Sequence, residues 1–149
     1  MLRKRTQARE CALQILYQYE MNPEPLPEIL EKFWFQQDET FSEDIRDFAE
    51  KLALGTVEHQ TEIDKIVERY ADNWELSRMA TIDRNVMRLA TFELLYLANV
   101  PPKVTLNEAV NLAKKFSQEE SGKFVNGILD KINHTEKPKN LKDHDPSAA

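Results

Sequence analysis

Apolar residues recur along most of the chain with the spacing of one face of a helix, and no segment alternates as a half-buried strand would. The pattern predicts an all-α protein of about seven helices. The expected helices cover roughly residues 3–21, 27–34, 43–55, 61–70, 77–98, 105–115 and 119–133. The stretch 77–98 is the most apolar, so we expect it at the centre of a helical bundle.

Turn and capping residues separate these stretches. Asn22-Pro23-Glu24-Pro25 ends the first helix, and Ser42 is a good N-cap for the third. Thr105 to Glu108 has the form of a capping box, which predicts a helix start at Thr105. The break at Asp72-Asn73-Trp74 suggests two packed subbundles, formed by helices one to three and by the later four.

Composition narrows the class of protein. A chain of 149 residues with only 3 glycines suits one helical domain, which we place at residues 1–133. The segment 134–149 lacks aromatic residues and is predicted to be a disordered tail. The single cysteine, Cys11, favours a reducing cytoplasm. The longest apolar run, Leu94 to Ala98, is far too short to span a membrane.

Residues that could carry chemistry are few. The sequence has no Gly-x-Ser-x-Gly elbow and no glycine-rich phosphate loop. Its three histidines, His59, His134 and His144, are scattered, and we expect His59 to be solvated on a charged helix surface. These features predict a protein that is not an enzyme and that uses no cofactor or metal.

The distribution of charge says more than its sum. The net charge is −6, yet residues 1–9 carry Arg3, Lys4, Arg5 and Arg9 with no acid, which leaves −10 on the rest. Arg5 and Arg9 are one helical turn apart, so both guanidinium groups could contact successive phosphates or unpaired bases. The alternative is a solvated terminus without a ligand.

A second basic set lies late in the chain, at Lys114, Lys115 and Lys123. The first two also suit the negative end of a helix dipole. Glycines at 122 and 127 fall at the start of a predicted helix and within it, where each costs about 1 kcal/mol relative to alanine. We expect tight helix packing at Gly127 or a ligand contact at Gly122.

Four segments, in the same order, resemble the motifs of the NusB family of transcription antitermination factors. The first is Arg5-Thr6-Gln7-Ala8-Arg9-Glu10-Cys11-Ala12 followed by Leu16-Tyr17. The others are Asp83-Arg84-Asn85-Val86-Met87-Arg88-Leu89-Ala90 with Glu93-Leu94, Val104-Thr105-Leu106-Asn107-Glu108-Ala109, and Lys123-Phe124-Val125-Asn126-Gly127-Ile128-Leu129-Asp130. The resemblance covers roughly residues 3–133.

This resemblance implies an all-helical fold of two subbundles and a role in transcription. Similar proteins pair with the small-subunit ribosomal protein that acts as NusE. Together they hold the single-stranded boxA element of nascent RNA, notably in ribosomal RNA operons, and help the RNA polymerase antitermination complex read through terminators. The resemblance implies no membrane association, and it leaves open whether the free protein forms a homodimer.

The resemblance also implies roles for individual residues. It places RNA contacts at Arg3, Lys4, Arg5, Arg9, Tyr70, Lys123 and Phe124. It places the protein-partner surface at Tyr17, Met21 and Asp83. Phe124 could instead belong to the core, Asp83 stands where the family can hold glutamate, and Glu120 adds a negative charge near Lys123.

Two other functions fit the pattern less well. One is an accessory domain of the kind related to RNA methyltransferases, which we do not expect because nothing follows residue 149 that could bind a methyl donor. The other is a helical adapter that binds only proteins, with its basic start solvated.

Overall fold

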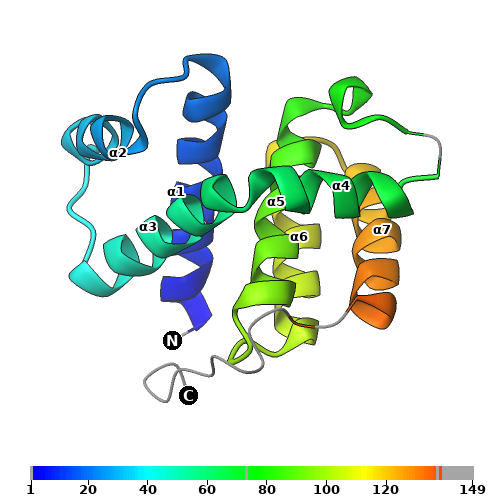
Figure 1. Cartoon of the computed structure of the whole chain (residues 1–149). Coiled ribbons are helices and arrows are strands. Elements are labelled where there is room, and N and C mark those ends of the chain that lie inside the picture. The colour runs from blue at the N-terminus through cyan, green and yellow to red at the C-terminus, as the bar shows by residue number, and fades with distance from the viewer. Residues whose placement is uncertain (1, 73, 137, 139–149) are drawn as a thin grey trace. The chain divides into compact units, whose positions relative to one another are not determined.

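The computed structural model describes residues 2–72, 74–136 and 138, and the regular elements within these ranges are all helices (Figure 1). This result confirms the predicted all-α class. The elements are α1 (Leu2–Met21), α2 (Leu26–Phe35), α3 (Glu43–Glu58), α4 (Gln60–Tyr70), the short 3-10 helix η1 (Leu76–Arg78), α5 (Thr81–Tyr96), α6 (Pro102–Phe116) and α7 (Ser121–Thr135).

The chain divides into two compact units, Met1–Glu58 and His59–Ala149. The first holds α1 to α3 and the second holds α4 to α7, as the sequence predicts. The boundary, however, lies just before α4 and not at the break near Asn73, which falls inside the second unit. The break in the amphipathic pattern near Asn73 is therefore not the boundary between the two units.

In the first unit, α1 packs along α3, and α2 covers α1. Ala8, Cys11 and Ile15 on α1 face Ile29 and Phe33 on α2 across a shared apolar core. Ser42 caps α3 as predicted, because its Oγ accepts a hydrogen bond of 3.3 Å from the backbone N–H of Ile45. Burial raises the pKa of the Cys11 thiol to about 12, so this cysteine stays protonated inside the core.

In the second unit, α5 is central and packs against α4, α6 and α7, which confirms the expectation for the most apolar stretch. Twelve of its residues, from Asp83 to Leu95, are buried. The helix begins at Thr81, later than the expected residue 77, because η1 occupies Leu76–Arg78.

The predicted capping box at Thr105 is wrong. Helix α6 begins at Pro102, and Thr105 lies inside it with its hydroxyl 3.0 Å from Glu93 Oε1. Pro102 has the fixed φ that favours the first turn of a helix, so the helix starts three residues earlier than the threonine signal. The threonine consequently faces α5 and makes a buried contact.

The last described residues extend the fold into the segment that the sequence assigned to the tail. Helix α7 continues to Thr135, and Glu136 accepts hydrogen bonds from Tyr70 and Arg69 of α4. The remainder of the expected tail, residues 137 and 139–149, lies outside the described residues. Among the helices that are described, none is long and apolar enough to cross a membrane.

Candidate nucleic-acid interface

The basic start of α1 lies exposed on the first unit. Arg3, Lys4 and Arg5 are all exposed, and the Arg5 guanidinium carbon sits 3.9 Å from the ring centroid of Phe48 on α3. Lys4 Nζ lies 3.6 Å from Asp44 Oδ2 at the surface. Lys4 and Arg5 border a hollow of about 390 Å³, which we call the basic hollow; its lining consists of Lys4, Arg5, Asp44, Asp47, Phe48 and Lys51. The lining carries three cations against two carboxylates, so its net charge is positive by one. The Phe48 ring also holds the Arg5 guanidinium at this surface.

Arg9 differs from its neighbours. Its side chain is only 2% exposed, and its guanidinium carbon lies 5.5 Å from the Phe48 centroid. One turn of helix separates Arg5 from Arg9, so both reach the same ring, but Arg5 approaches it from the surface and Arg9 from the interior. The sequence predicted that both would be available to RNA; in this structure only Arg5 is exposed.

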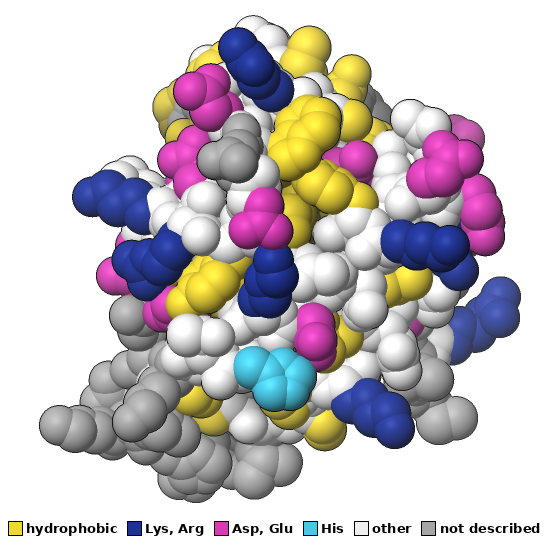
Figure 2. Space-filling view, turned by 90° about the vertical axis from the view of Figure 1, so that its right-hand side faces the viewer, with side chains coloured by type: hydrophobic (Ala, Val, Ile, Leu, Met, Phe, Trp, Pro, Cys, Tyr) yellow, Lys and Arg dark blue, Asp and Glu magenta, His cyan; other side chains and the backbone are white. Residues whose placement is uncertain are grey.

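A second surface lies on the unit formed by α4 to α7. The Trp74 ring is 51% exposed and meets the Phe124 ring edge to face, with centroids 5.9 Å apart. The hollow around them measures about 540 Å³, and we call it the aromatic groove. Its lining consists of Trp74, Arg78, Met79, Ala80, Asp83, Gln118, Glu120, Ser121 and Phe124. In Figure 2, hydrophobic side chains form a larger patch in the upper part of the visible face and smaller separate patches below it, with acidic and basic side chains between them.

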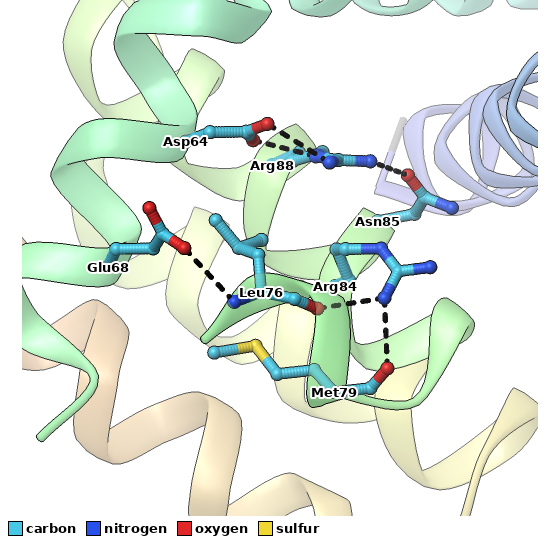
Figure 3. A network of polar contacts seen from close by, with 7 residues as sticks. All are labelled: Asp64, Glu68, Leu76, Met79, Arg84, Asn85 and Arg88. Atoms are coloured by element: carbon cyan, nitrogen blue, oxygen red, sulfur yellow. Dashed lines mark hydrogen bonds and ion pairs between the residues drawn. The ribbon is translucent and has the colours of Figure 1, made fainter. Parts of the chain in front are cut away.

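A polar network holds one wall of the aromatic groove in place (Figure 3). Arg84 Nη1 donates to the carbonyl oxygens of Leu76 and Met79, at 2.8 and 2.9 Å. Glu68 accepts a hydrogen bond of 3.2 Å from the backbone N–H of Leu76. Side chains of α4 and α5 thereby fix the short segment that carries Arg78 and Met79, so this wall does not depend on apolar packing alone.

A second polar contact joins the same two helices, because Arg88 of α5 binds Asp64 of α4. Its Nε and Nη2 donate to the two carboxylate oxygens at 2.7 and 3.0 Å, and its Nη1 donates to Asn85 Oδ1 at 3.2 Å (Figure 3). The Arg88 side chain is 10% exposed. A bidentate pair at this depth fixes the angle at which α4 meets α5.

Asp83 forms part of the floor of the aromatic groove and is 8% exposed. Its Oδ2 accepts a hydrogen bond of 3.1 Å from the Ser121 hydroxyl at the start of α7. Its Oδ1 is buried and has no hydrogen-bond partner among the described residues. A carboxylate oxygen in this state favours a donor brought by a ligand.

Tyr70 closes the end of α4. Its hydroxyl donates to Glu136 Oε2 at 2.6 Å, and Arg69 Nη1 contacts the same oxygen at 2.9 Å. The hydrogen bond to Glu136 raises the pKa of the Tyr70 hydroxyl, so Tyr70 remains neutral. Its side chain is half-buried.

On α6 and α7, polar side chains surround a hollow of about 450 Å³, which we call the amide groove. Its lining consists of Asn107, Val110, Asn111, Lys114, Gly122, Lys123 and Asn126. A Cβ atom added at Gly122 would lie 2.8 Å from Lys114 Cε and 3.2 Å from Val110 Cγ1, whereas one added at Gly127 would meet nothing within 4 Å. The close packing predicted for Gly127 is therefore found at Gly122.

Comparison with known proteins gives one consistent result. The model of the NusB family matches residues 6–134. The chain belongs to the NusB family. A transcription antitermination protein NusB from Thermodesulfovibrio yellowstonii is 48% identical over 137 residues, covering 87% of this chain and 91% of the relative. The NusB protein of Myxococcus xanthus is 48% identical over 130 residues, covering 86% and 93%.

Solved NusB structures have the same fold. Thermotoga maritima NusB superposes with a TM-score of 0.82 at 39% identity, covering 94% of this chain and 97% of that one. A chain from a complex of the antitermination factors NusB and NusE with double-stranded RNA gives 0.81 at 32% identity, covering 90% and 98%. Membership of the NusB family makes the chain an antitermination factor and not an enzyme.

The residues that the NusB resemblance assigned to a partner lie on both units. Tyr17 and Met21, one turn apart on α1, are 42% and 59% exposed. Asp83 lies in the aromatic groove together with Phe124, which the resemblance assigned to RNA. Phe124 is half-buried at this surface and is not a core residue.

Sequence reasoning missed two features of the second unit. Trp74 was read only as part of a break, although it is the most exposed ring of the aromatic groove. His59 is not on a solvated helix face; it stands at the start of α4, half-buried, with its ring 4.1 Å from Tyr96 and nearly parallel to it. An exposed tryptophan beside a helix break is a signal that could have pointed to the groove.

Proposed function

We propose that this chain acts with a NusE-type ribosomal protein to hold single-stranded RNA of the boxA kind on nascent transcripts, notably of ribosomal RNA operons. In this role it joins the RNA polymerase antitermination complex in the cytoplasm. One observation carries the proposal: the chain presents two chemically different surfaces, an exposed cationic end of α1 and an apolar groove that contains acidic groups. A structurally similar chain was solved with NusE and RNA, which supports the pairing.

The RNA side of the proposal begins at α1. Arg3, Lys4 and Arg5 supply positive charge at the surface for phosphates, and Arg5 is already ordered by the Phe48 ring. We assign Arg9 a positioning role. Its side chain is buried and its guanidinium lies near the Phe48 ring, which also contacts Arg5. Lys123 is exposed and Tyr70 is half-buried; we keep both as RNA contacts, with the tyrosine stacking through its ring face.

The partner side uses the aromatic groove. Trp74 and Phe124 offer rings of the kind that anchor protein interfaces, and the unpaired Asp83 Oδ1 would accept a donor from the partner. The groove lining contains two carboxylates, Asp83 and Glu120, and one cation, Arg78. This negative balance complements a basic ribosomal protein. Phe124 lines this groove beside Trp74, so we assign it to the partner surface. Tyr17 and Met21 add exposed contacts on α1.

The test is a titration of a boxA-type RNA against the full chain, with and without the ribosomal protein, at two salt concentrations. We expect the partner to increase the RNA affinity at least tenfold and to leave the salt dependence strong, because phosphate contacts release counterions. A partner that binds the chain but adds nothing to RNA affinity would contradict the proposal. Arg5→Ala should weaken RNA binding severalfold, whereas the exposed Lys65→Ala on α4 should not.

A further inference from the structure

The amide groove on α6 and α7 has a composition unlike the rest of this acidic protein. Its charged lining residues are Lys114 and Lys123, and no carboxylate lines it. Glu119, outside the lining, places its Oε1 3.8 Å from Lys114 Nζ, and its side chain is 82% exposed. Against a net charge of −6, a hollow with a purely positive lining favours an anionic ligand.

Three asparagine amides give the groove a second property. Asn107, Asn111 and Asn126 are exposed, and their side-chain amides make no hydrogen bond to other described residues. Each amide offers two donors and an acceptor, the pattern that pairs with the edges of nucleic-acid bases. Surface amides are individually common, but here three converge on one hollow with two lysines.

Backbone access is the third property. Gly127 follows Lys123 by one helical turn on the same face of α7, and a Cβ there would meet nothing. An exposed glycine inside a helix lowers stability relative to alanine, and here no close packing requires it. It does, however, leave α7 bare beside the groove, where a sugar-phosphate chain can approach closely.

We propose that the amide groove binds a second stretch of the same single-stranded RNA. Lys114 and Lys123 neutralise its phosphates, and the three asparagine side chains contact the exposed base edges. The inference rests on the proposed function, because it extends the same RNA beyond its first site. It gives Asn107, Asn111, Lys114 and Asn126 a role that the family resemblance does not assign.

The experiment compares three RNA probes with the full chain in the presence of the ribosomal partner. One is a minimal boxA-type RNA, the second carries single-stranded extensions at both ends, and the third carries abasic extensions of the same length. We expect the extended RNA to bind about tenfold more tightly than the minimal one, and the abasic RNA to keep only part of that gain.

Variants assign the gain to the groove. Asn107→Ala with Asn111→Ala should remove the advantage of bases over abasic sites. Lys114→Ala, at the groove cation that the first RNA site does not use, should reduce the gain for both extended probes about fivefold. Lys65→Ala, an exposed lysine on α4, is the matched control and should change neither. Circular dichroism and thermal unfolding verify that each variant is folded.

The outcomes separate the two proposals. If even the minimal RNA gains nothing from the partner, the proposed function fails. If the minimal RNA binds as expected but the extensions add nothing, or add affinity that the groove variants leave intact, only the second site is refuted. Groove variants that weaken binding of the ribosomal protein and spare the extended RNA would overturn the proposal in favour of a protein contact.

Discussion

The two grooves of the second unit share one helix and differ in almost everything else. Both use the first turns of α7: Ser121 and Phe124 line the aromatic groove, whereas Gly122, Lys123 and Asn126 line the amide groove. Successive residues of a helix point about 100° apart, so neighbours in one motif face different surfaces. The lesson is that a conspicuous sequence motif is not necessarily one site.

The two grooves are also built differently. The aromatic groove depends on the hydrogen bonds of Arg84 to Leu76 and Met79, which hold an irregular segment. The amide groove depends on α6 and α7 packing closely at Gly122. Mutations can therefore distinguish the two surfaces, and the expected effects are given from the largest to the smallest.

The largest effect is expected from Arg88→Met, which leaves the Asp64 carboxylate without its clamp. We expect a loss of about 3 kcal/mol in the free energy of unfolding, measured by urea titration, because breaking a largely buried ion pair strands a charge. Asp64→Leu combined with Arg88→Met should recover part of this loss. A single variant within about 0.5 kcal/mol of the original protein would show that the clamp does not support α4 and α5.

Trp74→Ala should act on the aromatic groove alone. Truncating an exposed anchor ring should weaken binding of the ribosomal partner by about 2 kcal/mol, or roughly 30-fold, as measured by calorimetry. The stability of the free chain should change little, because the ring is half-exposed. Equal affinity for the ribosomal partner before and after the change would show that the aromatic groove does not bind the partner.

Phe124→Ala sharpens the same comparison, because Phe124 was assigned to RNA by resemblance and lies beside Trp74 in the structure. We expect it to weaken partner binding by about 1 to 2 kcal/mol and to lower RNA affinity when the partner is present. Loss of RNA affinity without the partner, and unchanged partner binding, would instead make Phe124 a direct RNA contact only.

The smallest effect is expected at the glycines. Gly127→Ala should stabilise the free chain by about 0.5 to 1 kcal/mol, since the added methyl group meets open space and alanine favours the helix. Gly122→Ala should gain less or lose stability, because Lys114 and Val110 must move. Thermal unfolding of the two variants measures the difference; equal gains at both positions would contradict the packing described at Gly122.

The sequence predicted the helices well because amphipathic periodicity reports burial directly, as in the central α5. It failed where two local signals compete: Pro102 starts α6 ahead of the Thr105 capping pattern. For the site, it identified the basic start of α1, yet it could not show that Arg9 is buried, because arginines one turn apart look alike until α3 is packed against them. The grooves escaped prediction because residues distant in the chain line them, such as Trp74 and Phe124.

The central claim is that RNA and protein partner use different surfaces of one chain. A titration of boxA-type RNA against the original chain, Arg5→Ala and Trp74→Ala, each with and without the ribosomal protein, tests it most directly. We predict that Arg5→Ala lowers RNA affinity in both conditions, whereas Trp74→Ala leaves the affinity of the free chain unchanged and removes most of the enhancement by the partner. If both variants reduce RNA affinity in the same way with and without the partner, the two surfaces are one and the claim is wrong.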